Sequence, residues 1–291
     1  MKRLAAAALV AGGMLVGSVS TASGATLVGL SGGIVGPTGF YEVDAGDGSA
    51  TFVQPEPGAL GIANGGLDYL GDTLYVTNYS VSDSPFLYSY GTVNLSTGAF
   101  SSIGLHTGQW YGLAFDQSGG YFYTYDYNTS NLLKVTPGIS TEIIGSVTGF
   151  TSPFGIRNLA YDDANDILYA TDYYHQGVNL YTLNTNTGAA TLVGSLGFDP
   201  IDYGGHVPIA YDEVTGTLFA HNAIDRSLFT LDTATGLASL VGSHPDLVFA
   251  SLAVTPNAAP PVPLPAALPL LLSALGLFGF MGWRRKRLAA A

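Results

Sequence analysis

Short apolar stretches alternate with polar turns through the middle of the chain, and the same order of segments recurs. Each unit has an apolar triplet with an acidic turn, an aromatic strand, a loop, a second aromatic strand, a Thr-Gly turn and a final strand. One of the clearest units reads NLAYDDANDILYATDY from Asn158 and NLYTLNTNTGAATLVGSL from Asn179. Stretches of Tyr, Phe, Val, Leu and Thr bounded by Gly, Asn and Asp are typical of β-strands joined by tight turns.

The units have a regular period. Their first strands align on five aliphatic residues, Leu67, Leu113, Leu159, Ile209 and Leu252, which are spaced by 46, 46, 50 and 43 residues. This is the period of a propeller blade of four strands. Because one twisted sheet cannot bury both of its faces, neighbouring sheets are expected to stack around an axis.

The last unit predicts how the ring closes. It has only its first strand, at 252–254, whereas the segments TLVGLS, GFYEVDAG and SATFV after residue 25 match the three strands that it lacks. We therefore predict an all-β, five-bladed propeller over residues 26–256, with N- and C-terminal strands in one shared blade. The segments LYVTN and LYAT resemble YVTN-type propeller repeats of bacterial surface proteins, and this resemblance implies a fold rather than a function.

The N-terminus has the organisation of a secretory signal peptide. Lys2 and Arg3 precede an apolar run from Leu4 to about Val19, and small residues follow up to Ala25. We expect residues 1–25 to be a signal helix, with cleavage after Ala25 and export of the rest.

The C-terminus combines a proline-rich linker, an apolar stretch and a basic cluster. Residues 267–283 would span roughly 26 Å as a helix, close to the thickness of the hydrocarbon layer. The cluster Arg284, Arg285, Lys286 and Arg287 would stay in the cytoplasm. We therefore predict a linker over 257–266 and a transmembrane helix with a basic tail over 267–291.

The segment VPLPAALPLLLSALGLFGFMGWRRKR resembles the PEP-CTERM sorting signal, in the variant that begins Val-Pro-Leu-Pro-Ala. The resemblance implies recognition by an exosortase, a membrane transpeptidase-like enzyme of Gram-negative bacteria that make extracellular polysaccharide. It assigns the sorting motif to Val262, Pro263, Leu264, Pro265 and Ala266, and a stop function to the basic cluster. An ordinary single-pass tail anchor is the alternative.

Charge and composition exclude several classes of partner. The formal net charge is −12, and only Lys134, Arg157 and Arg226 are cationic between the two ends. Nucleic acid is excluded, because phosphate neutralisation needs clustered Lys and Arg. The acidic surface fits high-salt solubility, loose binding of divalent cations, or repulsion between neighbours. The chain has no cysteine, which excludes disulfides and thiolate chemistry.

Loops between the second and third strands of each unit carry a candidate ligand rim. They read NYSVSDS, YDYNTSN, DYYHQG and HNAIDRS, and equivalent loops of a propeller gather on one face. Tyr rings beside Asp and Asn acceptors suit stacking on sugars and hydrogen bonding to them. The alternative is that these residues cap turns. The candidate rim consists of Tyr79, Asp83, Asp126, Asn128, Asp172, Tyr173, His175, Asn222 and Asp225, with His221 beside them.

Other chemistries have weaker support. Calcium could bind oxygens of Asp83, Asp126, Asp172 and Asp225, although no loop has DxDxDG-type spacing, and no other cofactor is expected. The carboxylates of Asp162, Asp163, Asp166, Asp212 and Glu213 could be a glycosidase pair, but acidic turn residues are commoner at such positions. The five histidines lack HxH or HExxH spacing, and no Gly-x-Ser-x-Gly or phosphate-binding loop occurs.

These observations favour an exported, non-enzymatic surface protein in the cell envelope or on the extracellular surface of a Gram-negative bacterium. The expected role is structural, adhesive or polysaccharide-associated. The expected partners are a sorting enzyme, the membrane before processing, and extracellular polysaccharide. One alternative is a carbohydrate-active enzyme with carboxylates among Asp126, Asp172 and Asp225 facing the axis. Another is a protein-binding platform with an exposed apolar patch.

Overall fold

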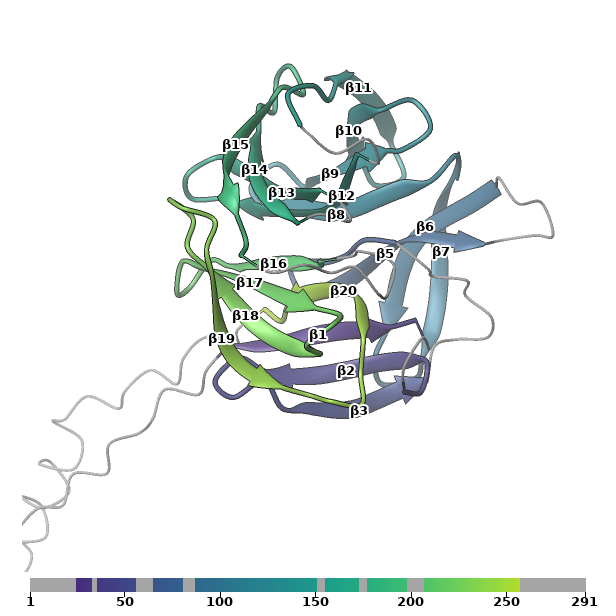
Figure 1. Ribbon diagram of the computed structural model, residues 1–291. Helices are drawn as coiled ribbons and strands as arrows, with labels where there is room; N and C mark the ends of the chain where they lie inside the picture. Colours follow the sequence, from purple (N-terminus) through teal and green to yellow (C-terminus); the bar gives the residue numbers. More distant parts are fainter. Residues whose placement is uncertain are drawn as a thin grey trace, which may run out of the picture.

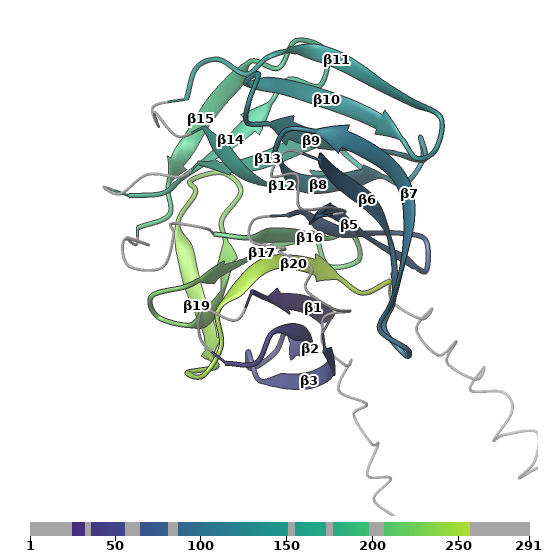
Figure 2. The ribbon, with the colours of Figure 1, turned by 90° about the vertical axis from the view of Figure 1, so that its right-hand side faces the viewer.

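The structure, a computed structural model, describes residues 25–32, 36–55, 65–80, 87–150, 155–172, 177–197 and 207–256. In these residues the chain forms twenty β-strands in five antiparallel four-stranded sheets, which we call blades. Figures 1 and 2 show the blades arranged around one axis. The prediction of an all-β, five-bladed propeller is confirmed.

Each blade places one strand next to the axis and three strands outside it. From the axis outward, the shared blade has β20 (Phe249–Val254), β1 (Thr26–Ser31), β2 (Gly39–Asp44) and β3 (Ala50–Pro55). The next two have β4 (Leu67–Leu70), β5 (Thr73–Ser80), β6 (Leu87–Asn94) and β7 (Ala99–Thr107), then β8 (Trp110–Asp116), β9 (Tyr121–Asp126), β10 (Asn131–Thr136) and β11 (Ser140–Ser146). The last two have β12 (Ile156–Asp162), β13 (Ile167–Asp172), β14 (Asn179–Leu183) and β15 (Ala190–Ser195), then β16 (Ile209–Asp212), β17 (Thr217–Asn222), β18 (Ser227–Leu231) and β19 (Ala238–Ser243).

Burial explains why the first strand of each unit is an apolar run. The innermost strands contact one another in the ring order β4, β8, β12, β16 and β20, and β20 contacts β4 again. Every residue of β8 and β12 is buried, whereas the outermost strands β11 and β15 are largely exposed. An inner strand packs against neighbours on both sides, so it cannot show the apolar and polar alternation of an edge strand.

The predicted closure of the ring is confirmed. Strand β20 pairs antiparallel with β1, with Leu27 opposite Val254 and Val28 opposite Ala253. Figure 1 shows yellow-green β20 beside purple β1. Thr255 continues this contact, since its backbone N–H and its hydroxyl donate to the carbonyl oxygen of Thr26 at 2.8 and 2.7 Å. The two ends of the folded region therefore lie in one sheet.

The hydrophobic core is divided among the interfaces between blades. Five clusters of buried side chains are present in the described residues, and each joins two neighbouring blades. The cluster around Phe249 joins the shared blade to the β16–β19 blade, and the cluster around Phe40 joins it to the β4–β7 blade. Because no blade has an apolar core of its own, we expect the blades to fold together.

Glycines allow neighbouring blades to meet through their backbones near the outer edge. A Cβ atom on Gly242 of β19 would collide with the carbonyl oxygen of Asp47 in the shared blade. A Cβ on Gly194 of β15 would collide in the same way with Thr235 in the next blade. Gly236, in a Thr-Gly turn, adopts φ +82° and approaches Gly194 from the other side. The Thr-Gly turn and the Val-Gly-Ser end of the repeat thus form two halves of one inter-blade contact.

The predicted signal helix, linker, sorting motif and transmembrane helix lie outside the described residues, apart from Ala25. Within the residues that the structure describes, no helix is long and apolar enough to span a bilayer.

Candidate functional site

The five residues that set the period of the repeat meet at the axis. Leu67, Leu113, Leu159, Ile209 and Leu252, which we call the axial ring, are each no more than 3% exposed. Together they line both a small void on one side of the ring, of about 10 Å³, and a larger pocket on the other side. The axial ring thus separates the two ends of the central channel.

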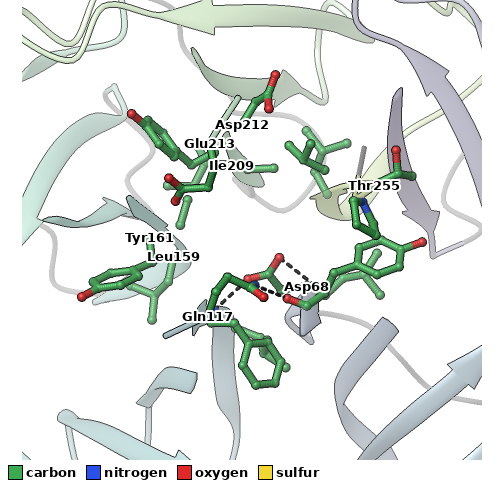
Figure 3. Close-up of a pocket in the computed structure, with 18 of the residues that line it drawn as sticks. Asp68, Gln117, Leu159, Tyr161, Ile209, Asp212, Glu213 and Thr255 are labelled. Atoms are coloured by element: carbon green, nitrogen blue, oxygen red, sulfur yellow. Dashed lines mark hydrogen bonds between the residues drawn. The ribbon is translucent and has the colours of Figure 1, made fainter. Parts of the chain in front are cut away.

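The larger space, which we call the axial pocket, has a volume of about 240 Å³. It opens at the end of the propeller where the turns join the first and second strands of the blades. Aromatic side chains at equivalent positions of four blades contribute to its wall: Tyr69, Phe115, Tyr161 and Tyr211. Its polar lining includes Asp68, Gln117, Asp212, Glu213 and Thr255 (Figure 3). No Lys, Arg or His is among the described residues that line it.

Asp68 is the exception to the repeat in this pocket. It follows the first member of the axial ring, and the position that follows each other member is an alanine: Ala114, Ala160, Ala210 and Ala253. The fold therefore needs only a small apolar side chain there. The aspartate in place of alanine is visible when GLDYL is aligned with GLAFD, NLAYD, PIAYD and SLAVT. The loop pattern did not predict Asp68 as a site residue.

Two backbone donors hold the Asp68 carboxylate in place. The N–H of Tyr69 donates to Oδ1 and the N–H of Phe115 to Oδ2, both at 2.8 Å. Burial is the main cause that raises the pKa of Asp68, and the nearby Glu213 carboxylate also raises it. The two hydrogen bonds lower this pKa, and the net result is a pKa of about 7. Asp68 can therefore change its charge near neutral pH.

A second set of polar side chains links adjacent turns around the pocket mouth. Gln117, Asp163 and Glu213 occupy the same position of three successive blades, four residues after the axial ring. Each accepts a backbone N–H from the turn of the preceding blade: from Gly71 at 3.1 Å, from Ser118 at 3.2 Å and from Asp163 at 2.7 Å, respectively. The amide of Gln117 also donates to the carbonyl oxygen of Tyr69 at 2.6 Å. These bonds fix the turns that form the rim of the pocket.

The acidic turn residues serve the turns themselves. Asp212 accepts hydrogen bonds from the backbone N–H of Val214 at 3.0 Å and from the hydroxyl of Thr215 at 2.6 Å. Asp212 therefore caps its own turn, whereas Asp163 and Glu213 accept hydrogen bonds from the turn of the preceding blade. Burial raises the pKa of the Asp163 carboxyl and that of the Glu213 carboxyl.

The pocket lies at the opposite end of the propeller from the candidate rim. Strands two and three are joined at the end where the innermost strand begins, whereas the pocket opens where that strand finishes. Asp126, Asp172 and Asp225 are therefore not among its lining residues. Asp126, Asp172 and Asp225 thus do not meet in this pocket, whereas Asp212 and Glu213, from the acidic turns, both line it.

Most described members of the rim make hydrogen bonds within their own loops. Asp126 accepts the backbone N–H of Asn128 at 3.0 Å, and Asp172 accepts that of Asn179 at 2.8 Å. Asn222 donates from its side-chain amide to the carboxylate of Asp225 at 3.0 Å. Asn128 accepts the backbone N–H of Gln109 at 2.8 Å. Asn128 thus contacts the segment between β7 and β8, and the other contacts are those of turn-capping residues.

The remaining predicted positions are not described. Asp83, Tyr173 and His175 lie outside the described residues, as does the side chain of Tyr79, whose backbone is part of β5. In the described part of the chain, no three His, Cys, Asp or Glu side chains are grouped so that they could hold a metal ion. Calcium binding by the full rim remains a prediction.

Two histidines are buried where the β16–β19 blade meets the shared blade. The rings of His221 and His244 stack with centroids 4.9 Å apart and an interplanar angle of 15°. His244 makes a hydrogen bond through Nδ1 with the carbonyl oxygen of Gly48 at 2.9 Å. Burial lowers the pKa of His221 well below its usual value and also lowers that of His244. Both rings are therefore neutral at physiological pH.

Comparison with known proteins supports the fold and goes no further. No protein-family model and no curated protein matches the sequence. Among solved structures, a chain of a nidogen/laminin complex is similar, with a TM-score of 0.51 and 13% identity over 80% of this chain and 99% of that chain. TolB from Acinetobacter baumannii has a TM-score of 0.48 and 12% identity, over 76% of this chain and 52% of that chain. At 13% identity the likeness to the chain of the nidogen/laminin complex concerns the fold alone.

Proposed function

We propose that this chain is an exported surface protein of a Gram-negative cell envelope whose propeller binds a component of extracellular polysaccharide in the axial pocket. One observation carries the binding role: a closed ring of blades surrounds a pocket with aromatic walls and polar groups at fixed positions. Pockets that combine apolar surface with a few placed polar groups are typical of small-ligand sites.

Export and sorting rest on the two ends of the sequence. The signal-peptide pattern up to Ala25 and the resemblance of Val262–Ala266 and the residues after it to a PEP-CTERM signal support passage across the membrane and recognition by an exosortase. In this proposal residues 1–25 and 257–291 direct the protein to its location, and residues 26–256 perform its function.

A binding role is favoured over catalysis. None of Asp126, Asp172 and Asp225, the carboxylates of the carbohydrate-active enzyme alternative, lines the axial pocket. Asp212 and Glu213 do line it, but both accept hydrogen bonds from the turns that form its mouth. Asp172 is fully buried and accepts hydrogen bonds from Asn179 and from the hydroxyl of Tyr181. Its oxygen atoms are therefore engaged within the protein.

Sorting is tested by mass spectrometry of the protein isolated from an exosortase-containing host. Processing near Val262 predicts that peptides containing Trp283 and Arg284 are absent from the mature protein. An intact C-terminal peptide would contradict sorting and favour the tail anchor.

Binding is tested on a glycan array with the full-length protein in a mild detergent. We expect retention of a subset of bacterial polysaccharide fragments, and loss of that retention in Asp68→Ala. A matched control is Glu142→Gln, which removes one carboxylate from the exposed face of β11, far from the axis. Equal retention by all three proteins would contradict a role for the axial pocket.

A further inference from the structure

We propose that the axial pocket recognises a protonated amino group carried on a single sugar ring, that is, an amino sugar of a polysaccharide. This inference rests on the proposed binding function and specifies the class of ligand. It follows from the charge of the pocket, from the exceptional position of Asp68, and from the size and chemistry of the walls.

The pocket carries only negative formal charge. Asp68, Asp212 and Glu213 line it, and the described lining contains no Lys, Arg or His. The cations Lys134 and Arg157 pack elsewhere, over the rings of Tyr121 and Tyr111. An anionic ligand would meet repulsion here, whereas a cation would gain from all three carboxylates.

The three carboxylates are not equally available. Asp212 is only 1% exposed and is held in its own turn by Val214 and Thr215, whereas Asp68 is partly exposed. Asp68 accepts one N–H at each oxygen, and an ionised carboxylate has about four acceptor positions. Asp68 therefore has acceptor capacity left for a ligand while its orientation is already fixed.

Asp68 destabilises the folded state, and the fold does not require a carboxylate at this position. Burial of a carboxylate without a compensating cation disfavours folding, and four of the five blades have alanine at this position. Such a residue is expected where a ligand supplies the missing charge. Burial raises the pKa of Asp68 and that of Glu213, and a cationic ligand beside these carboxylates would offset this effect.

The walls and the volume favour a sugar ring as the carrier of the amino group. Tyr69, Phe115 and Tyr161 are buried in the clusters between blades. Tyr211 is partly exposed, and an aromatic ring can pack against the apolar face of a sugar and attract a cation. The volume of about 240 Å³ is sufficient to admit one sugar ring. Figure 3 shows Asp68 and Gln117 together on one side of the pocket and Glu213 on another side. These groups could contact an amino group and hydroxyls of the same ring.

The test is calorimetric titration of the full-length protein, in mild detergent at pH 7, with glucosamine, glucose and N-acetylglucosamine. The three sugars differ only in the group at one carbon, and only glucosamine has an ammonium group. We expect glucosamine to bind at least about tenfold more tightly than the other two, as for the loss of a charge-assisted hydrogen bond. We also expect proton release on binding, seen as a dependence of the heat on the ionisation enthalpy of the buffer.

Variants connect the binding to the pocket. Asp68→Ala installs the residue of the other four blades, so it should stay folded and weaken glucosamine binding about tenfold or more. Glu213→Gln keeps an acceptor for the N–H of Asp163 and should weaken binding as well, while Glu142→Gln should have no effect. A thermal melt of each variant verifies that it is folded.

Each contrary result has a separate meaning. Equal binding of glucose and glucosamine, reduced by Asp68→Ala, would overturn the amino-group inference and leave the proposed sugar-binding function standing. Methylamine, an ammonium ion without a sugar ring, is titrated as well. If it binds as tightly as glucosamine, the inference that the pocket recognises a sugar ring is overturned. Failure of all three sugars to bind, while the glycan array still shows retention that depends on Asp68, would overturn the inference alone. Failure of both experiments would overturn the proposed function too.

Discussion

Gly29, from the first strand of the propeller, lies directly opposite Leu252, from the last strand. A Cβ atom at Gly29 would lie 2.7 Å from the ring of Phe249, which is fully buried in the same blade. The absence of a side chain at Gly29 therefore lets an aromatic ring from the C-terminal strand pack over the N-terminal one. This contact joins the two ends of the folded region inside the shared blade.

Gly29→Ala is expected to destabilise the propeller by about 1–3 kcal/mol, because the added methyl overpacks the contact with Phe249. Phe249→Leu should cost stability alone but should recover part of the loss when combined with Gly29→Ala. Denaturant unfolding of the two single variants and the double variant measures this coupling. Strictly additive losses would contradict the contact.

Gly242→Ala tests the backbone contact between the β16–β19 blade and the shared blade. The new methyl would collide with the carbonyl oxygen of Asp47, which cannot rotate away as a side chain can. We expect a loss of about 3 kcal/mol in unfolding free energy. Gly46→Ala is the control, because its methyl would meet only the side chain of Asp44, at 3.1 Å. A similar small effect for both variants would count against this inter-blade contact.

Asp68→Ala should change how stability depends on pH. The pKa of Asp68 is raised from 3.8 to about 7, so the folded state holds a proton that the unfolded state has lost between these values. The stability that this bound proton gives the folded state is therefore lost as pH rises through about 7. The loss in unfolding free energy between pH 5 and pH 8 amounts to about 2–3 kcal/mol. Thermal or chemical unfolding at both pH values should show that wild type gains this stability on acidification relative to Asp68→Ala. A difference in unfolding free energy between the two proteins that stays constant with pH would contradict the raised pKa of Asp68.

His221→Leu should reduce sensitivity to acid. His221 is fully buried and its pKa is lowered, so below pH 6.5 the unfolded state binds a proton that the folded state does not. Stability is lost as pH falls, by about 2 kcal/mol at pH 5 for one such histidine. Leucine fits here, because Leu30 occupies the equivalent position in the shared blade. Unfolding at pH 5 and pH 8 should show a gain for the variant at pH 5 that shrinks at pH 8.

The architecture was predictable because it depends on a period. Each blade repeats the same strands, and the mismatch between the lone β20 and the three strands after residue 25 indicated the shared blade. The aliphatic residues that mark the period, such as Leu67, are those that meet at the axis. Repetition of a residue type at a fixed interval is readable without coordinates.

The site was harder to predict because it depends on a departure from the repeat. Asp68 differs from the alanine of the other blades by one substitution, and its importance appears only when the structure places it beside the axis. Polar loop residues such as Asp126 and Asn222 are prominent in the sequence but make hydrogen bonds in their own turns. Sequence composition alone does not separate a turn-capping carboxylate from one that faces a pocket.

Closure of the ring creates the axial pocket, and a paired substitution tests it most directly. Val28 lies opposite Ala253 in the shared blade, both are buried, and the chain has no other cysteine, so Val28→Cys with Ala253→Cys can form only one intramolecular disulfide. We predict that the oxidised double variant forms this bond and gains on the order of 4–5 kcal/mol in unfolding free energy, since the bond closes nearly the whole folded chain. Cysteines that stay reduced in the folded monomer under oxidising conditions, or that link only separate molecules, would contradict a propeller closed by its two ends.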